Sequence, residues 1–280
     1  MGTIKVESLK VVYNGKTILK NLNLNFDTIG ITSIIGPNGS GKSTILRAIG
    51  RLIKPSGGYV LLDGKDIHSL PTKEVAKKMA ILPQGPKSPD GITVRDLVGY
   101  GRAPYQSMFK NSDPEGNDII EWALNVTGLR DLADRYVDTL SGGERQRAWI
   151  AMALAQKTEV LLLDEPTTFL DIHHQLEVLE LLERLSEQEK IKIIMVIHDI
   201  NHAAWFSKRI IVVKDGSVVK DDVPEKVLTE QLLRDVFGVN AKILTVDKGS
   251  GRLTIHCVPY EVCKNRYDVE KSAVGQQQQW

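Results

Sequence analysis

The stretch that decides the fold reads Gly36-Pro37-Asn38-Gly39-Ser40-Gly41-Lys42-Ser43-Thr44. It follows a short apolar run, residues 31–35, that is typical of a buried strand. After the loop, apolar residues recur at helical spacing, at Ile45, Leu46, Ile49 and Leu52. A glycine-rich loop between a strand and a helix fits the pattern G-x-x-x-x-G-K-[ST] of a phosphate-binding loop. The sequence therefore predicts an α/β fold built around a nucleotide phosphate site.

The residue types in this loop suit phosphate chemistry. Glycines let backbone N–H groups turn toward phosphate oxygens with no Cβ in the way. A helix that begins near Lys42 points the positive end of its dipole at the anion. Lys42 adds a charge for the β- and γ-phosphates, and the Ser43 hydroxyl is a ligand for Mg²⁺. A chance glycine turn is the alternative, which the flanking strand and helix disfavour. The loop alone predicts an NTPase or a kinase.

A pair of carboxylates ends a second buried strand. Asp164 and Glu165 follow the apolar residues 160–163. Asp164 can reach Mg²⁺ through water, and Glu165 is then a candidate general base for the attacking water. A solvent-facing acidic pair is the alternative, which the apolar run and the upstream loop disfavour.

A second glycine turn reads Leu140-Ser141-Gly142-Gly143-Glu144-Arg145-Gln146-Arg147. A Ser-Gly-Gly turn before a helix offers a second anion site, made of a helix N-terminus and bare backbone. One chain needs only one γ-phosphate cradle, so the second makes sense if it serves the nucleotide of a partner. Two identical chains placed head to tail would each close the other's site. An ordinary helix cap with Glu144 is the alternative, and the residues alone leave both open.

Together these features resemble the ABC ATPase family, the nucleotide-binding subunits of ABC transporters. The resemblance covers residues 3 to about 240, and its motifs keep the family's order and spacing. The matching segments are residues 36–44 for Walker A, Gln84 for the Q-loop, Leu140 to Gln146 for the signature, residues 160–165 for Walker B with its catalytic glutamate, Phe169-Leu170-Asp171 for the D-loop, His198 for the H-loop and Tyr13 for the aromatic residue that stacks on adenine.

The resemblance implies a role for each matching residue. The residues implied to bind ATP are Tyr13, Gly36, Asn38, Gly39, Ser40, Gly41, Lys42, Ser43 and Thr44. Ser43, Gln84 and Asp164 are implied to hold Mg²⁺, and Glu165, His198 and Gln84 to form the catalytic group. The signature residues implied to clamp the other subunit's ATP are Ser141, Gly142, Gly143 and Gln146, with Asp171 at the dimer seam. A lone histidine at a strand end is more often structural, but the strand 193–197 and the upstream motifs favour the H-loop interpretation of His198.

Three further strings resemble the ATPases of ferrichrome-type iron–siderophore importers. They are Tyr100-Gly101-Arg102 with Pro104, residues 147–156, and residues 164–172 with His174-Gln175. Heme and cobalamin importers are close relatives of that group. Because these strings mark lineage and do not touch a substrate, a ferric siderophore is the expected solute by analogy, with heme, cobalamin or another metal chelate as alternatives. Two other classes compete: a soluble ABC protein that remodels a nucleic-acid complex, and a simple P-loop phosphotransferase that would leave the second glycine turn unexplained.

Composition and hydropathy limit the classes of partner that this chain can have. The net charge of +1 argues against nucleic acid as a partner. No apolar run approaches the roughly 20 residues that span a bilayer, and residues 1–10 do not form a signal peptide. We therefore expect a peripheral subunit on the cytoplasmic face of the cell membrane. Its expected partners are a second copy of itself, integral-membrane permease subunits and, indirectly, an extracytoplasmic solute-binding protein. Cys257 and Cys263 are expected to be reduced thiols.

The expected fold is a P-loop NTPase (RecA-like) core with an N-terminal antiparallel β subdomain and an inserted α-helical subdomain. The expected boundaries are residues 1–85 and 156–241 for the core, 86–155 for the helical subdomain, 242–274 for a small strand-rich extension and 275–280 for a disordered tail. Hairpin turns are predicted at Asn14-Gly15, Asp63-Gly64 and Asp215-Gly216, and one helix face at Leu176, Leu179, Leu182 and Leu185.

A permease helix is expected to dock in a groove between Gln84 and Tyr105. Prolines and exposed aromatics suit such a contact, namely Pro86, Pro89, Pro104, Tyr105 and Phe109. An ordinary surface loop is the alternative.

Overall fold

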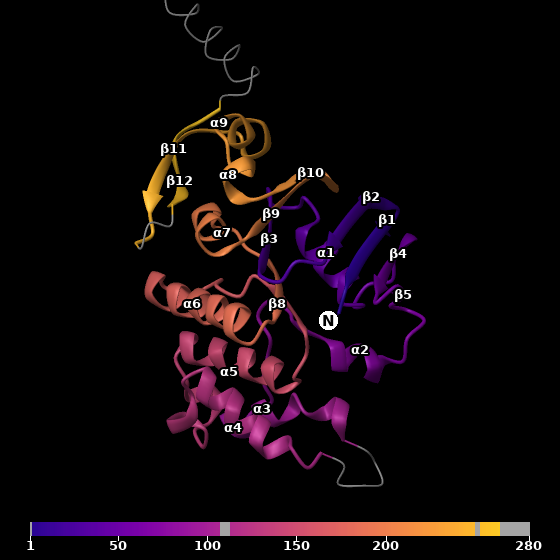
Figure 1. Ribbon diagram of the computed structural model, residues 1–280, viewed down its shortest axis with the longest axis vertical. Helices are drawn as coiled ribbons and strands as arrows, with labels where there is room; N and C mark the ends of the chain where they lie inside the picture. The colour runs from indigo at the N-terminus through magenta and orange to yellow at the C-terminus, as the bar shows by residue number, and fades with distance from the viewer. Residues whose placement is uncertain (1, 107–112, 250–252, 264–280) are drawn as a thin grey trace, which may run out of the picture.

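The computed structural model describes residues 2–106, 113–249 and 253–263. Figure 1 shows helices α3, α4 and α5 gathered at one end of the molecule and the hairpin of β11 and β12 at the other. The strands β1, β2 and β4 lie to one side, next to α1, and α6 and α7 lie on the opposite side of the central strands. No helix in the described ranges is both long and apolar enough to cross a bilayer.

Within these residues the strands form three sheets. A four-stranded sheet has the order β2-β1-β4-β5, a six-stranded sheet the order β10-β9-β3-β8-β7-β6, and β11 pairs with β12. The strands are β1 Ile4–Tyr13, β2 Lys16–Phe26, β3 Ile31–Ile35, β4 Gly57–Leu62, β5 Lys65–Asp66, β6 Met79–Leu82, β7 Val160–Asp164, β8 Lys192–Val196, β9 Arg209–Lys214, β10 Ser217–Asp222, β11 Val239–Asp247 and β12 Leu253–Val262.

The α-helices are α1 Lys42–Ile49, α2 Thr72–Lys78, α3 Val94–Tyr100, α4 Gly116–Val126, α5 Gly142–Ala155, α6 Ile172–Gln188, α7 Ile200–Phe206, α8 Pro224–Val227 and α9 Glu230–Leu232. Short 3₁₀ turns lie at Ala103–Tyr105, Arg130–Leu132 and Val137–Thr139, and a π-helix at Leu233–Phe237. The expected fold class is confirmed.

The central strands explain why two cores form. Every residue of β3, β7 and β8 is buried, as expected for parallel strands covered on both faces. Successive side chains of a strand point to opposite faces. Ile34 therefore packs into one core with α1 and the four-stranded sheet, and Ile35 packs into the other core with α5, α6 and α7.

The parallel pairing also positions the candidate site. Strands β6, β7, β8, β3 and β9 run parallel, so their carboxyl ends share one edge of the sheet. The loops after β3, β6, β7 and β8 carry Gly36, Gln84, Glu165 and His198. Ligands of such sheets bind at this edge.

The three predicted hairpin turns are confirmed. Asn14, Asp63 and Asp215 have φ values of 49°, 52° and 49°, and the glycine after each has 76°, 76° and 71°. Positive φ at both central residues is the signature of a two-residue type I′ turn, which matches the twist of the flanking strands.

The predicted apolar face of α6 was wrong at its first residue. Leu176 is 38% exposed, whereas the buried face consists of Val178, Leu179, Leu181, Leu182 and Leu185. An α-helix turns about 100° per residue, so four residues spaced by three drift by about 180° around its axis. Leu176 and Leu185 therefore cannot share one face.

The predicted exposure of Tyr105 was also wrong. Tyr105 is half-buried: its ring centroid lies 3.9 Å from the Arg102 guanidinium carbon, and its hydroxyl donates to the carbonyl oxygen of Gln156 at 3.1 Å. Arg102 is buried and holds Asp113 with two hydrogen bonds of 2.8 Å. Phe109 and residues 275–280 lie outside the described residues.

The β11–β12 hairpin begins three residues before the predicted extension of residues 242–274 and docks on α7; residues 264–274 lie outside the described residues. The Asn201 side chain accepts from the backbone N–H of Cys257 at 2.7 Å and donates to its carbonyl oxygen at 3.1 Å. Cys257 and Cys263 are free, as expected, and burial raises the pKa of the Cys257 thiol to about 11.

Candidate nucleotide site

A cavity of about 810 Å³ lies at the carboxyl edge of the six-stranded sheet, within the size range of small-molecule sites. Its lining residues are Val11, Tyr13, Ile18, Asn38, Gly39, Gly41, Lys42, Ser43, Thr44, Arg47, Leu52, Ile53, Pro83, Glu165 and His198. The structure thus brings the phosphate loop, the exposed ring of Tyr13, Glu165 and His198 to one place.

The loop glycines occupy positions that other residues would strain. Gly39 and Gly41 have φ values of 74° and 103°, in the region that favours glycine. Gly36 has a φ of 152°, and a Cβ there would lie 2.0 Å from the carbonyl oxygen of Val213. The backbone can therefore close tightly around the space before α1, where a phosphate would sit.

Lys42 is held inside the loop. Its ammonium donates to the carbonyl oxygens of Gly36 and Pro37, each at 2.9 Å, and the residue is only 5% exposed. Burial lowers the pKa of Lys42, with Glu165 and Asp164 opposing that shift. A phosphate oxygen carries more negative charge than a carbonyl, so Lys42 can exchange these neutral acceptors for an anion.

Ser43 and Asp164 offer oxygens suited to Mg²⁺. The Ser43 hydroxyl donates to Asp164 Oδ1 at 2.8 Å, and Asp164 is 3% exposed. Asp164 Oδ2 is buried without a hydrogen bond in the described part of the chain, although Arg47 Nε lies 3.5 Å away at ion-pair distance. An unsatisfied carboxylate oxygen beside a hydroxyl is a donor set that fits a small hard cation. Arg47 was not predicted, although its position four residues after Ser43 on α1 places it on the same helix face.

Three side chains of its own chain contact the Glu165 carboxylate. Gln84 Nε2 and the Thr168 hydroxyl donate to Oε2 at 2.6 and 3.0 Å, and His198 Nε2 lies 2.5 Å from Oε1. Glu165 also has a φ of 56°, a left-handed conformation that costs a non-glycine residue about 1 kcal/mol or more. No local pattern points to this role of Thr168, because the role depends on the tight turn that follows Glu165.

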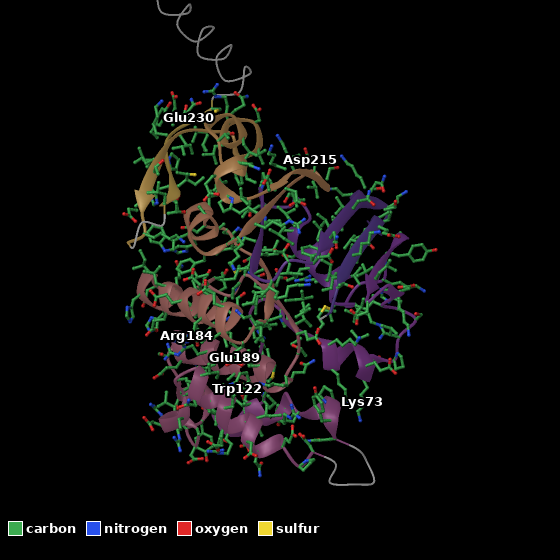
Figure 2. All side chains as sticks on the ribbon, viewed as in Figure 1. Lys73, Trp122, Arg184, Glu189, Asp215 and Glu230 are labelled. Atoms are coloured by element: carbon green, nitrogen blue, oxygen red, sulfur yellow. The ribbon has the colours of Figure 1, made fainter. Side chains whose placement is uncertain are left out.

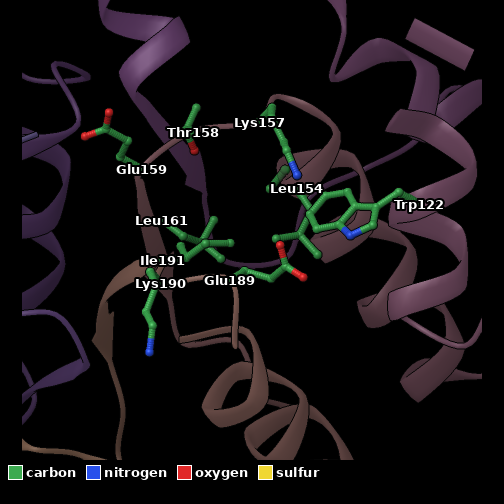
Figure 3. A pocket seen from close by; sticks show the side chains of 10 residues that line it. Trp122, Leu154, Lys157, Thr158, Glu159, Leu161, Glu189, Lys190 and Ile191 are labelled. Atoms are coloured by element: carbon green, nitrogen blue, oxygen red, sulfur yellow. The ribbon is translucent and has the colours of Figure 1, made fainter. Parts of the chain in front are cut away.

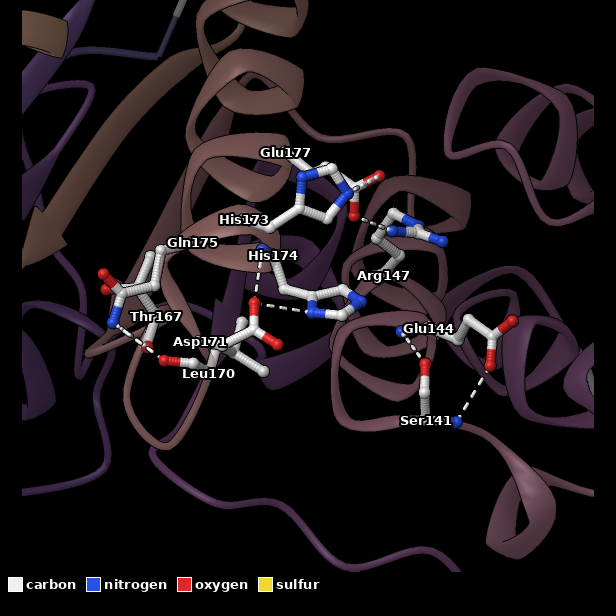
Figure 4. Close-up of polar contacts among 10 residues, drawn as sticks. All are labelled: Ser141, Glu144, Arg147, Thr167, Leu170, Asp171, His173, His174, Gln175 and Glu177. Carbon is white, nitrogen blue, oxygen red and sulfur yellow. Dashed lines mark hydrogen bonds and ion pairs between the residues drawn. The ribbon is translucent and has the colours of Figure 1, made fainter.

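The signature turn lies elsewhere on the chain. None of Ser141, Gly142, Gly143 and Gln146 is among the residues that line the cavity, and neither is Asp171. Ser141 caps α5: its hydroxyl accepts from the Glu144 N–H at 3.3 Å, and the Glu144 carboxylate accepts from the Ser141 N–H at 2.8 Å (Figure 4). That N–H holds the pKa of Glu144 below its usual range. The helix cap is thus confirmed, and both the backbone and the side chain of Ser141 interact with Glu144.

Asp171 likewise caps α6. Its Oδ1 accepts from the backbone N–H of His174 at 3.0 Å, which is the main reason that the pKa of Asp171 is lowered. A carboxylate at this position satisfies an N–H that the first turn leaves unpaired.

A smaller cavity of about 300 Å³ lies at the opposite edge of the sheet (Figure 3). It is lined by the end of α5, by residues at and before the start of β7, by residues before β8, and by Trp122, whose ring centroid lies 3.7 Å from the Lys157 ammonium. Because ligands of parallel sheets bind at the carboxyl edge, the larger cavity is the candidate nucleotide site.

Comparison with known proteins supports this assignment. Residues 19–168 match the family described as ABC transporter. The chain is 47% identical over 269 residues to the iron(3+)-hydroxamate import ATP-binding protein FhuC of Bacillus subtilis (strain 168), covering 96% of this chain and 99% of that protein. It is 49% identical over 260 residues to the probable siderophore transport system ATP-binding protein YusV of the same strain, covering 93% and 94%.

Solved structures of ABC transporters and their cassettes also match this chain. An inward-facing putative metal-chelate type ABC transporter matches with a TM-score of 0.80 and 26% identity, over 93% of this chain and 98% of that one. Two dimeric structures of the ABC cassette MJ0796, one of them a post-hydrolysis state with ADP and Pi, each match with a TM-score of 0.68 and 32% identity, over 79% and 98%. Fold, cavity and relatives confirm the resemblance: the chain belongs to the ABC transporter family and is an ATPase.

Proposed function

We propose that this chain is the ATP-hydrolysing subunit of a ferric-siderophore importer and that it works as a homodimer closed by ATP. One observation supports the proposed dimer: the signature residues do not line the nucleotide cavity of their own chain. A second copy would supply Ser141, Gly142, Gly143 and Gln146 to that cavity. The siderophore is supported by the two relatives from Bacillus subtilis, one an iron(3+)-hydroxamate import protein and the other a probable siderophore transport protein.

In the proposed mechanism the adenine stacks on Tyr13, whose ring is 68% exposed at the cavity mouth. The phosphates enter the loop of residues 36–44, and Lys42 transfers its hydrogen bonds from Gly36 and Pro37 to them. Ser43 and Asp164, joined by Gln84, would hold Mg²⁺, which supplies positive charge to the phosphates when bound.

Glu165 is the proposed base for the attacking water. In this structure Gln84 and Thr168 donate to one of its carboxylate oxygens and His198 contacts the other, so these three side chains orient the carboxylate while Oε1 keeps room to accept a proton. Gln84 stands just before residues 86–155, the proposed helical subdomain. A movement of that subdomain would withdraw Gln84 and release Glu165, while His198 would turn to the γ-phosphate.

The proposed setting is the cytoplasmic face of the cell membrane. Integral-membrane permease subunits would bind the groove between Gln84 and Tyr105, and an extracytoplasmic solute-binding protein would act through them. Two lysines of α2 reach the Tyr105 end of the proposed groove: Lys73 (Figure 2) donates to the Gln106 carbonyl oxygen at 2.8 Å, and the Lys77 ammonium lies 4.9 Å from the Tyr105 ring centroid. These contacts join that end of the proposed groove to α2.

Growth tests the proposed solute. Cells that lack this chain should fail to grow on a ferric hydroxamate siderophore as the only iron source. Wild-type chain should restore growth, whereas Glu165→Gln should not, because turnover stops. Growth lost only on heme or only on cobalamin would assign one of those solutes instead. Co-purification with ribosomes rather than a permease would contradict the importer assignment.

A further inference from the structure

The signature turn packs directly on the helix that follows the D-loop. A Cβ at Gly143 would lie 2.1 Å from His174 Cδ2 and 2.7 Å from His174 Cγ. Gly143 lies within α5 and is not among the residues with positive φ, so its backbone conformation is open to any residue. The His174 ring, rather than the backbone, therefore requires glycine at this position.

The His174 ring is fixed from its other side. Asp171 Oδ1 lies 2.8 Å from His174 Nδ1 and also accepts from the His174 backbone N–H (Figure 4). A carboxylate accepts only, so Nδ1 carries the proton. One Asp171 oxygen thus caps α6 and orients the imidazole, whose Cδ2 edge rests on Gly143.

The same stretch of chain reaches the proposed catalytic base. Thr168 donates to Glu165 Oε2 at 3.0 Å, and Gln175 Nε2 donates to the Leu170 carbonyl oxygen at 3.0 Å. Residues 165–171 therefore form a short, internally bonded connection between Glu165 and the cap of α6. The Leu170 side chain also lies against the signature turn, 3.4 Å from where a Cβ of Gly142 would be.

We propose that His174 is a positioning residue that fixes the signature turn to residues 165–171 of its own chain. The signature turn serves the partner's ATP, whereas Glu165 serves the chain's own ATP. His174 would therefore make the two composite sites of the dimer move together. This inference rests on the homodimer of the proposed function.

Three variants separate the ring contact on Gly143 from the side-chain contact with Asp171. His174→Ala removes both of these contacts but keeps the backbone N–H that Asp171 caps. His174→Asn keeps an N–H that can reach Asp171 but loses the ring on Gly143. His173→Ala is the control, because the His173 side chain is 76% exposed and contacts Glu177 and, edge-on, the His174 ring; the variant leaves the His174 ring itself on Gly143.

The first measurement is amide hydrogen exchange of residues 141–145 in the monomer without nucleotide. We expect faster exchange in His174→Ala and His174→Asn but wild-type exchange in His173→Ala. The second is ATPase kinetics: kcat should fall about tenfold in both His174 variants, while the ATP affinity of the monomer stays within about twofold. Equal exchange in the His174 and His173 variants would overturn the proposal, and so would a parallel loss of monomer ATP affinity.

The third measurement separates this inference from the proposed function. Glu165→Gln alone should form an ATP-bound dimer, and adding His174→Ala should raise the ATP concentration needed for it about tenfold. A Glu165→Gln protein that stays monomeric with saturating ATP overturns the proposed dimer and this inference with it. A dimer that forms equally well with and without the His174 side chain overturns this inference alone.

Discussion

The two glycine turns of this chain, residues 36–44 and 141–143, look alike in sequence but differ in why they need glycine. In the first, Gly39 and Gly41 take positive φ values, so the backbone itself excludes other residues. In the second, both glycines begin a regular helix, and only Gly143 leaves no room for a Cβ, because the His174 ring lies against it. The first turn needs glycine chiefly for its backbone conformation, with Gly36 also packed against the Val213 carbonyl, whereas the second needs it only for the segment that packs on it.

Their charges differ as well. The first turn contains the buried ammonium of Lys42, directly in the cavity. The second offers a serine hydroxyl and backbone N–H groups, and its cap includes the carboxylate of Glu144. A full positive charge binds phosphate more strongly than neutral donors do. The first turn should therefore set ATP affinity, and the second should matter only when the dimer closes.

The largest expected effect tests the first half of this comparison. Lys42→Ala should weaken ATP binding to the monomer about a hundredfold, because one hydrogen bond to a charged group contributes roughly 2–3 kcal/mol. Isothermal titration with ATP measures it, and Lys20→Ala, an exposed lysine on β2, is the control. The comparison fails if Lys42→Ala binds normally while Ser141→Ala does not.

The fold was predictable where a local pattern determines it. Uninterrupted apolar runs correctly predicted the buried strands, and Asn-Gly and Asp-Gly pairs correctly predicted the hairpin turns. Errors arose where tertiary packing, and not the local sequence, determines whether a side chain is buried. Leu176 looks like a core residue, yet it sits before the buried face of α6, and Tyr105 is covered by an arginine that a surface-loop interpretation does not anticipate.

The site was predictable where function resides in a contiguous motif. The phosphate loop, Glu165 and His198 line one cavity, as the motifs suggest. Arg47, Thr168 and His174 were missed in their roles because each acts through tertiary contact: beside Asp164, on Glu165 and against Gly143. A contiguous motif identifies candidate ligand-binding residues, but it does not identify the residues from elsewhere in the chain that position them.

The second prediction tests the packing account of the signature turn. Gly143→Ala should lower kcat about thirtyfold with normal ATP affinity of the monomer, because an overpacked contact costs about 1–3 kcal/mol. Gly142→Ala should lower it less, since its Cβ would lie 3.4 Å from Leu170. Steady-state ATPase kinetics measure both.

A double variant sharpens this test. Removing the ring in Gly143→Ala/His174→Ala relieves the clash, so kcat should recover to the level of His174→Ala alone. Strictly additive losses would show that the alanine acts on phosphate contact and not on packing.

The third prediction concerns the segment that joins the two turns. Thr168→Val should lower kcat about tenfold, because Glu165 loses one hydrogen bond to its charged oxygen. ATP affinity should stay unchanged, as Thr168 does not line the cavity. Thr168→Ser keeps the hydroxyl and should keep wild-type turnover. A weaker affinity in Thr168→Val would place this residue with the first turn instead.

The smallest expected effect lies at the ion pair that also links α5 to α6. Arg147 Nη1 lies 2.7 Å from Glu177 Oε2, but the glutamate side chain is 39% exposed, so water screens the pair. Glu177→Gln should change kcat by less than about twofold and lower the free energy of unfolding by about 0.5 kcal/mol, a loss that shrinks at high salt. Urea unfolding at two ionic strengths measures this, with the exposed Glu180→Gln as control. If Glu177→Gln slows turnover as much as His174→Ala does, the ion pair and not the histidine ring positions the signature turn, and the packing explanation for Gly143 would have to give way to an electrostatic one.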